Sequence, residues 1–378
     1  MSYAVHVEYL FAIVEIEKMD GVLSRLSNEV RYGVLYLGNY SILKLISPRP
    51  DYVEVRVTEG CNSRCITCGA WKNSREGELS TEEMIDAFKQ LREIGVKSIR
   101  ISGGEPLIRS DIVELIKECR LLKFQDVYVA TNGLLLPQKG EELVKGGVTH
   151  FGVSLDGIGE TNDVIRGVTG GYERVLEGIN VIKRSMKKVG TDIPITVFTT
   201  LLRQNVREVP LLLKLCEDIG VSWCFSLLDG NLDFFEGIDI SDLVIKDWKV
   251  IDETIDYLKK LWNEKPWLVY SGPQILEYAR NYLKGIERDD DLPCTLGYKV
   301  ISLGSRGQVY AGCYVFEPIG SIRETRLSNI VKSKEYKALA EKMYRRECSG
   351  CTFFYEDNVL IRHMFPKAER IRSLVRSK

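Results

Sequence analysis

Three cysteines within eight residues, Cys61, Cys65 and Cys68, restrict the fold of this chain more than any other feature. They follow an alternating, β-branched run at 53–58, which predicts a β-strand that ends just before the first cysteine. The cysteines therefore lie on a loop at the carboxyl end of a strand. Three thiolates on one short loop can bind three irons of a four-iron cluster and leave the fourth iron open. Catalytic metal sites keep such a free position, whereas structural sites fill it.

The C-x3-C-x2-C spacing resembles the signature of the radical SAM enzymes, although cysteine triplets also occur in zinc sites and ferredoxin-like proteins. Two further motifs extend the resemblance. Residues 102–106, Ser-Gly-Gly-Glu-Pro, are similar to the GGEP motif of that family, and residues 153–157, Val-Ser-Leu-Asp-Gly, match another family position. One departure is Thr67, because the family usually has an aromatic residue before the third cysteine. Backbone contact with adenine is compatible with Thr67, but ring stacking is not.

Residues 51–228 alternate between predicted strands and helices, which indicates parallel strands joined by right-handed crossovers. The resemblance sharpens this α/β prediction to a partial (β/α)6 TIM-like barrel with its motifs at the carboxyl ends of strands, where such barrels place active sites. A capping box at Ser80 to Glu83 predicts the start of the first helix. The other expected strands are 97–101, 126–130, 149–154, 194–200 and 221–227. The expected helices are 80–94, 111–122, 141–145, 172–187, 206–219, 241–263 and 274–284.

A second set of cysteines lies in the C-terminal part of the chain: Cys294, Cys313, Cys348 and Cys351. A hairpin is expected at 299–311 and a helix at 332–346. This arrangement resembles the auxiliary-cluster domain called twitch, within the wider SPASM group. The resemblance implies one auxiliary [4Fe-4S] cluster with four protein ligands, which either accepts an electron or is structural. Zinc is the alternative, because it also binds four thiolates.

The resemblance also implies which residues bind S-adenosylmethionine at the open iron. Gly103 and Gly104 lack a Cβ atom, which would let the backbone approach the methionine amine. Arg166 would pair with the methionine carboxylate through two parallel donors. Ser154 would contact polar groups of the cofactor, and Asn132 would reach the ribose. The full set of candidate cofactor-binding residues is Thr67, Gly103, Gly104, Glu105, Asn132, Ser154 and Arg166. Asp156 is ambiguous, because it could bond to its own loop instead of the cofactor.

Three other cysteines belong to neither set. Cys119 and Cys216 lie on apolar helix faces and are expected in the core. Cys224 lies in the sixth predicted strand, where alternation could point it into the barrel, so it is the one candidate catalytic residue. Three histidines show no metal-ligand spacing and are expected to be structural: His6, His150 and His363.

The remaining segments are less informative. Residues 8–27 fit an amphipathic helix, and residues 30–46 fit a hairpin. We interpret this segment as a cap beside the barrel. The alternatives are a peptide-docking element and a membrane-surface helix. The acidic stretch 229–240 is a solvated connector or a substrate-contacting loop. The expected organisation is a cap at 1–50, a barrel at 51–240, a helical linker at 241–290, an auxiliary-cluster domain at 291–361 and a basic tail at 362–378.

Composition narrows the class of protein. The formal net charge is −1, so no global field favours nucleic acid. No apolar run approaches the roughly 20 residues of a membrane helix, and no basic leader precedes the short apolar stretch near the N-terminus, which argues against a signal peptide. Ten cysteines without export signals indicate metal ligands in a reducing cytoplasm.

The resemblance implies that a reduced [4Fe-4S] cluster cleaves S-adenosylmethionine to a 5′-deoxyadenosyl radical, which removes hydrogen from a substrate. A small molecule, sugar or lipid precursor is the leading substrate class, and the implied partner is an electron donor such as ferredoxin or flavodoxin. The net reaction is oxidation, epimerisation or C–C bond formation. A peptide-modifying enzyme is the alternative. A cluster-dependent methyltransferase would need cobalamin or a methyl-carrying cysteine. A non-catalytic iron–sulfur or zinc scaffold would leave the glycine motif without a purpose.

Overall fold

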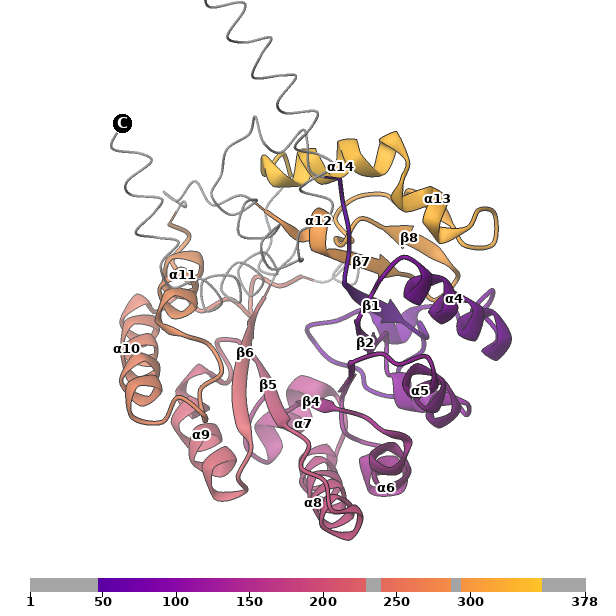
Figure 1. The fold of residues 1–378 in the computed structure, drawn as a ribbon. Helices are drawn as coiled ribbons and strands as arrows, with labels where there is room; N and C mark the ends of the chain where they lie inside the picture. The colour runs from indigo at the N-terminus through magenta and orange to yellow at the C-terminus, as the bar shows by residue number, and fades with distance from the viewer. Residues whose placement is uncertain (1–46, 229–238, 287–293, 349–378) are drawn as a thin grey trace, which may run out of the picture.

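The computed structural model describes residues 47–228, 239–286 and 294–348 (Figure 1). Six parallel strands fan out with helices on their outer side, and the sheet does not close into a barrel, as the predicted partial (β/α)6 architecture requires. The expected cap elements at 8–27 and 30–46, most of the acidic stretch, Cys351 and the basic tail lie outside the described residues. The six strands are β1 (Tyr52–Arg56), β2 (Ser98–Ser102), β3 (Asp126–Thr131), β4 (His150–Ser154), β5 (Ile195–Leu201) and β6 (Ser222–Leu227).

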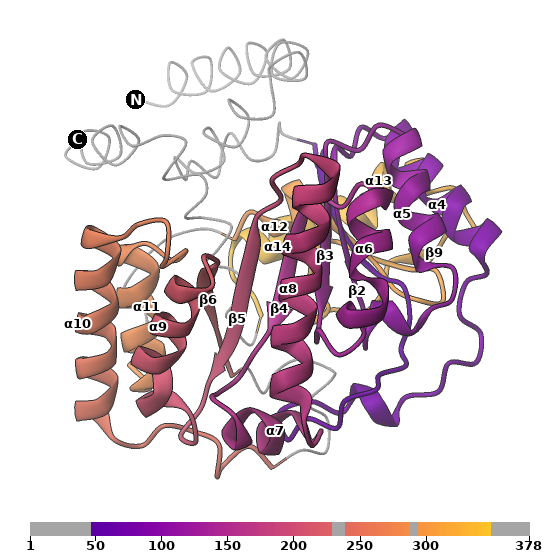
Figure 2. The same cartoon turned by 90° about the horizontal axis from the view of Figure 1, so that it is seen from below.

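Helices follow these strands in sequence order and pack on the outside of the sheet, with α9, α10 and α11 grouped at the β6 end (Figure 2). They are α4 (Thr81–Glu93), α5 (Ile112–Leu121), α6 (Leu136–Gly146), α7 (Glu160–Arg166), α8 (Gly171–Val189), α9 (Val209–Asp218), α10 (Trp248–Glu264) and α11 (Pro273–Leu283). Three short 3-10 turns complete this part: η1 (Ala70–Lys72), η2 (Pro106–Ile108) and η3 (Val206–Glu208).

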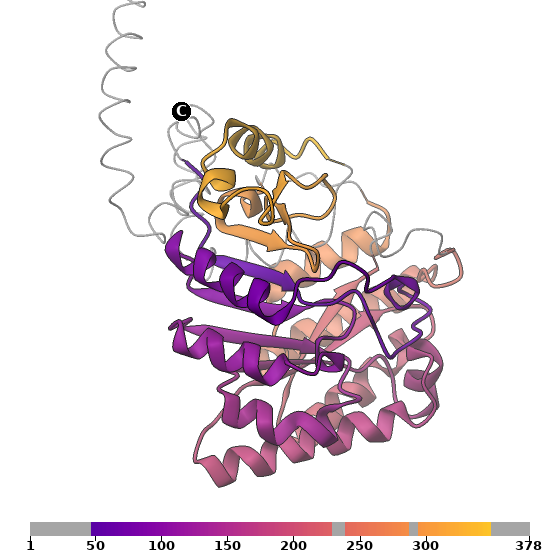
Figure 3. The same cartoon turned by 90° about the vertical axis from the view of Figure 1, so that its right-hand side faces the viewer.

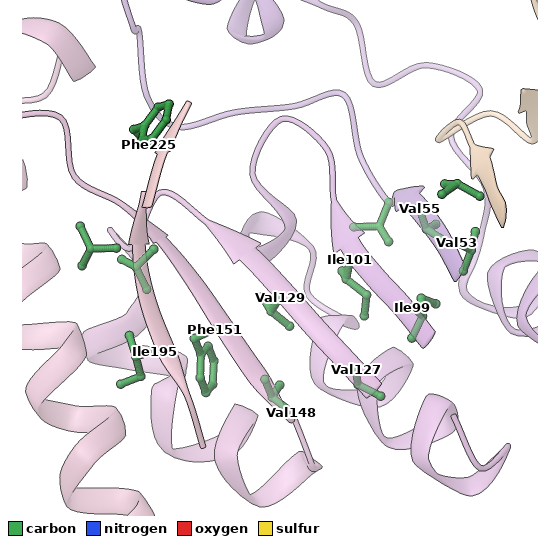
Figure 4. Packing of buried hydrophobic residues seen from close by; sticks show 14 of the residues in the cluster. Val53, Val55, Ile99, Ile101, Val127, Val129, Val148, Phe151, Ile195 and Phe225 are labelled. Carbon is green, nitrogen blue, oxygen red and sulfur yellow. The ribbon is translucent and has the colours of Figure 1, made fainter. Parts of the chain in front are cut away.

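The main core lies between the sheet and these outer helices. Alternate residues of each strand are fully or almost fully buried there, because successive side chains point to opposite faces. Each such Val or Ile contributes about 1.5–3 kcal/mol through burial. Figure 4 shows several of them: Val53, Val55, Ile99, Ile101, Val127, Val129, Phe151 and Ile195.

The intervening residues form a polar row across the other, concave face of the sheet. Glu54 pairs in register with Arg100, Arg100 with Tyr128, and Tyr128 with His150. The Arg100 guanidinium lies 5.2 Å from the Tyr128 ring centre, and the Tyr128 and His150 rings lie 4.8 Å apart. His150 Nε2 also lies 2.9 Å from Thr196 Oγ1. This histidine therefore belongs to the packed polar floor of the barrel.

The C-terminal hairpin predicted at 299–311 is present, but it does not stand apart from the barrel. Strand β7 (Val300–Leu303) pairs in parallel with β1, and β8 (Gln308–Tyr310) and β9 (Gly320–Ser321) continue the sheet in antiparallel fashion. The order β6-β5-β4-β3-β2-β1-β7-β8-β9 therefore covers the open edge of β1, and Figure 3 shows the hairpin stacked beside it. The helices of this part are α12 (Leu296–Lys299), α13 (Leu327–Val331) and α14 (Lys334–Tyr344).

Several predicted boundaries were wrong. Helix α6 is longer than the expected 141–145, because Pro137 fits the first turn of a helix, where its missing N–H costs nothing. Helix α10 begins at Trp248 instead of 241, because the Asp247 carboxylate accepts from the backbone N–H groups of Lys249 and Val250 at 3.1 and 3.3 Å. Helices α7 and α13 were not predicted, since each spans only one or two turns.

The predicted capping box opens α4 and also ties it to the C-terminal part. The Ser80 hydroxyl accepts from the Glu83 N–H, and the Glu83 carboxylate accepts from the Ser80 N–H at 2.8 Å. Arg323, which follows β9, donates from Nε and Nη2 to the two Glu83 oxygens at 2.8 and 2.9 Å. Glu83 therefore joins the start of a barrel helix to the extended sheet.

Glu83→Gln is expected to make the free energy of unfolding less dependent on pH in the acidic range. Arg323 and then the Ser80 N–H lower the pKa of Glu83 to about 2. Since the folded pKa lies below the unfolded value, the stabilisation is present at pH 7 and is lost as pH falls from about 4.5 towards 2. The site is exposed, so solvent limits the effect at pH 7 to about 1 kcal/mol.

Urea unfolding of the metal-free chain between pH 7 and pH 3 measures this difference, with Glu173→Gln as the control, since Glu173 is exposed and forms no ion pair within the described residues. If both variants lost the same free energy of unfolding at every pH, the low pKa assigned to Glu83 would be contradicted.

No helix among the described residues is long and apolar enough to cross a membrane.

Candidate metal and cofactor site

The cysteine loop leaves β1 at the carboxyl edge of the sheet and is joined to the loop that follows β2. Val57 N–H donates to the Ser102 carbonyl at 3.0 Å. Gly104 N–H then donates to the Thr58 carbonyl, and Glu105 N–H to the Gly60 carbonyl, each at 2.8 Å. The ladder between the two strands therefore continues into their loops and fixes the approach to Cys61.

Gly103 and Gly104 are required by this close approach of two backbones. A Cβ atom on Gly103 would lie 2.4 Å from the Thr58 carbonyl oxygen, and the residue has a φ of +139°. A Cβ atom on Gly104 would lie 2.2 Å from the Gly60 oxygen. The sequence suggested that these glycines admit the methionine amine. The contacts in this structure show another role, which is to let the β2 loop pack directly against the cysteine loop.

Glu105 is fully buried and holds the loop after β3. Its carboxylate accepts from Thr131 Oγ1 at 2.7 Å, from Asn132 N–H at 2.6 Å and from Leu107 N–H at 3.0 Å. Burial raises the pKa of Glu105, and these three donors oppose that rise. The motif glutamate thus fixes two neighbouring loops at the carboxyl edge.

Asn132 contacts the cysteine loop directly. Its amide Nδ2 donates to Asn62 Oδ1 at 2.7 Å and to Ser63 Oγ at 2.9 Å, while its Oδ1 accepts from Leu134 N–H at 3.0 Å. Asn132 was predicted from the resemblance to reach a ribose. In this structure its Nδ2 is bonded to side chains next to Cys61, and its Oδ1 to the backbone of its own loop.

Helix α7 lies at one edge of the sheet (Figure 2), and its last residues, Ile165 and Arg166, are hydrogen-bonded to the cysteine loop. Arg64 N–H donates to the Arg166 carbonyl at 3.1 Å, and Ile66 N–H to the Ile165 carbonyl at 3.0 Å. Gly167, with a φ of +64°, ends the helix where a Cβ would lie 2.3 Å from the Arg64 oxygen. The end of α7 therefore pairs with the cysteine loop almost as a strand would.

The Arg166 guanidinium pairs with Asp156, the aspartate whose role the sequence left ambiguous. Arg166 Nη1 lies 3.0 Å from Asp156 Oδ2, and Asp156 Oδ1 accepts from Thr200 N–H at 2.7 Å. Asp156 thus bonds to the loops of its own protein. Since Nη1 is used in this pair, Asp156 fixes the orientation in which Arg166 faces the thiols.

Of the three cysteines of the loop, Cys65 is buried, and Cys61 and Cys68 are half-buried. Burial raises the pKa of Cys65 to about 11, although the Arg166 guanidinium opposes the rise. Cys61 Sγ accepts from Ser63 N–H, and Cys68 Sγ from Ala70 N–H, each at 3.4 Å. Within the described residues, no three His, Cys, Asp or Glu side chains are gathered as they would be around a single metal ion.

Ser154 and Cys224 share one row of the sheet near its carboxyl edge. Ser154 pairs in register with Phe198, and Phe198 with Cys224. Cys224 is buried, and its Sγ lies 3.4 Å from Ser271 Oγ. Thr67, in the cysteine loop, is also buried.

The other unassigned cysteines, Cys119 and Cys216, are fully buried in α5 and α9. Burial raises the pKa of Cys216 to about 12, so its thiol stays protonated, as expected of a core residue.

The second cysteine set comes from three separate segments of the C-terminal part. Cys294 is buried just before α12, and its N–H donates to the Tyr344 carbonyl at 3.3 Å. Cys313 is half-buried after β8, and Cys348 is exposed after α14. The predicted fourth ligand, Cys351, lies outside the described residues.

Two positioning residues were missed in the sequence. Buried Asn205 donates from Nδ2 to the carbonyls of Asp156 and Thr200, each at 2.8 Å. The Glu78 carboxylate accepts from Thr58 Oγ1 at 2.7 Å and from Glu59 N–H at 2.8 Å. Neither residue lies in a motif, and both support the site from a distance in sequence, so no local pattern could have identified them.

Comparison with protein families gives two matches. Residues 55–216 match the Radical SAM superfamily, and residues 294–352 match the SPASM family, described as an iron-sulfur cluster-binding domain. The first match spans β1 to α9, and the second spans the four C-terminal cysteines.

Curated relatives match mainly in the first of these regions. Pre-heme d1 synthase of Dinoroseobacter shibae is 36% identical over 178 residues, or 46% of this chain and 42% of the relative. GTP 3′,8-cyclase of Listeria welshimeri is 33% identical over 180 residues, or 46% of this chain and 52% of the relative. The matched segment thus spans about half the length of these relatives.

Solved structures match over most of the chain at low sequence identity. SuiB of Streptococcus suis bound to S-adenosylmethionine has a TM-score of 0.61 at 17% identity, covering 89% of this chain and 80% of that one. Native anSMEcpe with bound AdoMet has a TM-score of 0.60 at 16% identity, covering 86% and 99%. At this identity the likeness shows the fold.

Proposed function

From the premise that this chain contains a radical SAM domain followed by a SPASM iron–sulfur cluster-binding domain, we propose that it is a radical SAM enzyme. When bound, a reduced [4Fe-4S] cluster and S-adenosylmethionine supply a 5′-deoxyadenosyl radical that abstracts hydrogen from the substrate. The observation that carries this proposal is the pairing of α7 with the cysteine loop, which brings the Arg166 guanidinium within electrostatic reach of the Cys61 and Cys65 thiols.

The donor set fits a four-iron cluster bound by Cys61, Cys65 and Cys68. Thiolates are the usual protein ligands of such clusters. Backbone N–H groups already donate to the sulfurs of Cys61 and Cys68, and such bonds favour negative charge on sulfur. Since burial raises the pKa of Cys61 and Cys65, these thiols are protonated without a cluster, and cluster binding would release protons from the loop.

The other residues of the edge position the loop and would hold the organic cofactor. Arg166, oriented by Asp156, would meet a carboxylate, and Ser154 and Thr67 would contact polar groups of the cofactor. Gly103, Gly104 and Glu105 fix the cysteine loop against the β2 loop, and Asn132 clamps it from the β3 side. In this proposal their main contribution is to hold the cysteine ligands and the cofactor carboxylate in fixed relative positions.

The second cysteine set would hold an auxiliary [4Fe-4S] cluster through Cys294, Cys313, Cys348 and Cys351. Four protein thiolates would leave no open iron, so this cluster would accept an electron or stabilise the extended sheet. Cys294 and Cys313 flank the β7–β8 hairpin that covers β1, which would connect the auxiliary cluster to the barrel through one continuous sheet.

We favour a small-molecule, sugar or lipid-precursor substrate, since pre-heme d1 synthase and GTP 3′,8-cyclase, both above 30% identical in the barrel region, are named for small-molecule reactions. A peptide substrate is the alternative, because SuiB has been solved with a precursor peptide. A ferredoxin or flavodoxin would deliver the electron, and a reducing cytoplasm would keep the ligand cysteines available.

The test uses protein purified and reconstituted without oxygen. We expect about eight irons per chain, four for each cluster, and formation of 5′-deoxyadenosine from S-adenosylmethionine with dithionite. About four irons together with zinc would make the C-terminal set structural. No iron and no nucleoside under any reductant would leave a non-catalytic scaffold.

A further inference from the structure

A small polar cavity lies where the cysteine loop, the end of β1 and the C-terminal hairpin meet. Its volume is about 290 Å³, which is at the small end for ligand sites and suits one polar group of a larger molecule. The described residues that line it are Arg56, Glu59, Asn73, Ser74, Gly304, Arg306, Gln308, Tyr310 and Tyr314. The cavity thus touches both cysteine-bearing parts of the chain: Arg56 precedes Cys61, and Tyr314 follows Cys313 directly.

Positive charge exceeds negative charge in this cavity. Two guanidinium groups, those of Arg56 and Arg306, line it together with one carboxylate, that of Glu59. The Glu59 oxygens are already used, because Oε1 accepts from Ser305 Oγ at 2.7 Å and Oε2 from Asn73 Nδ2 at 3.2 Å. The carboxylate is therefore engaged in joining the two walls of the cavity.

Both arginines are held in place before any ligand arrives. The Arg56 guanidinium lies 3.8 Å from the centre of the Tyr314 ring, and this ring packs against Tyr310 at 4.8 Å. Arg306 donates from Nε to the Glu76 carbonyl at 2.8 Å and from Nη2 to the Ser74 carbonyl at 2.7 Å. A guanidinium fixed in this way loses little freedom on binding, which favours affinity.

The side chain of Tyr314 also lines this cavity. Its hydroxyl is buried and has no hydrogen-bond partner among the residues that the structure describes. Burial raises the pKa of Tyr314 well above its usual range, the Glu54 carboxylate adds to this rise, and the Arg56 guanidinium opposes it. The phenol therefore keeps its proton at neutral pH, and a buried donor of this kind is costly unless a ligand accepts from it.

We propose that this cavity binds an oxyanion group of the substrate, a carboxylate or a phosphate, through Arg56 and Arg306 with Tyr314 as an additional donor. The proposal rests on the proposed function, to which it adds a substrate class. Guanidinium groups match both anions through parallel donors. A ligand held at this wall lies between the cysteine loop and the hairpin, so the site would fix the orientation of the substrate at the mouth of the barrel.

Calorimetric titration of the reconstituted, oxygen-free holoprotein at low salt tests this site without any turnover. The probes are inorganic phosphate and succinate. We expect at least one to bind the wild type and to bind Arg56→Gln at least about tenfold more weakly, since a charge-assisted hydrogen bond is lost. The matched control is Arg207→Gln, which removes the same charge from an exposed arginine paired with Asp247. Its affinity should equal that of the wild type.

A second variant covers the case in which Arg56→Gln fails to fold. Tyr314→Phe keeps the ring against Arg56 and removes only the buried hydroxyl, so the better probe should bind severalfold more weakly. Tighter binding of phosphate would indicate a phosphorylated substrate, and tighter binding of succinate a carboxylic acid. Absence of binding heat with both probes, or equal affinity in the wild type and both pocket variants, would overturn the proposal. Since no step requires S-adenosylmethionine, failure here is distinct from failure of the nucleoside assay.

Discussion

Replacing Cys61, Cys65 and Cys68 together by alanine is expected to lower the iron content from about eight to about four atoms per chain and to abolish 5′-deoxyadenosine formation. The reason lies in the position of the loop. The loop is paired with the end of α7 and is held by the β2 and β3 loops, whereas Cys294 and Cys313 flank the β7–β8 hairpin on the other side of β1. Each set of cysteines should therefore bind its iron–sulfur cluster independently of the other.

Iron and sulfide analysis, with nucleoside detection after dithionite reduction, measures both effects. The matched control is the double variant Cys119→Ala and Cys216→Ala, which removes two thiols from the helix cores. We expect that control to lose some stability through the small cavities it creates but to keep all of its iron. Full iron content or continued nucleoside formation in the triple variant would show that this loop is not the cluster site.

The barrel was predictable because its signals are local and repeated. Alternating β-branched strands, the Ser80 capping box and the glycine motif each act within a few residues, and the structure places β2 and α4 within a residue of the expected bounds. Cys119 and Cys216 were also predictable as core residues, since each lies on an apolar helix face.

The extension of the sheet could not be predicted from the same signals. The sequence showed a hairpin at 299–311 but not that β7 would pair with β1, because that pairing depends on which edge of the barrel remains open. The same limit explains why Arg56 and Tyr314 were not singled out. Their contact joins β1 to the segment after β8, which only the completed sheet brings together.

The roles of the motif residues show where local reasoning was incomplete. From the resemblance, Gly103, Gly104 and Asn132 were predicted to contact the cofactor. The structure shows that they contact the cysteine loop itself. Both roles can hold together, since a residue that seats the loop also lines the edge where a cofactor would bind. Only the contact with the cysteine loop affects the protein without its cofactor. This role can therefore be tested by measuring the stability of the metal-free chain.

Gly104→Ala is expected to destabilise the chain by about 2–4 kcal/mol and to reduce iron loading at the first site. The new Cβ would lie 2.2 Å from the Gly60 oxygen and 2.6 Å from the Glu59 oxygen. Both are backbone atoms, so no side chain can rotate away. Relief of this clash must separate the β1 and β2 loops and break the bond from Glu105 N–H to the Gly60 carbonyl.

Gly146→Ala is the matched control, because it adds the same methyl group to a buried glycine with room around it. Its nearest neighbour would be Ile116 Cγ2 at 3.4 Å, an ordinary contact, and alanine favours the helix by up to about 1 kcal/mol. Urea unfolding of the metal-free chains gives the two free energies, and iron analysis follows reconstitution. Equal stability of the two variants would mean that the loops separate without cost. In that case the glycine pair would owe its place in the motif to the cofactor instead of to the cysteine loop.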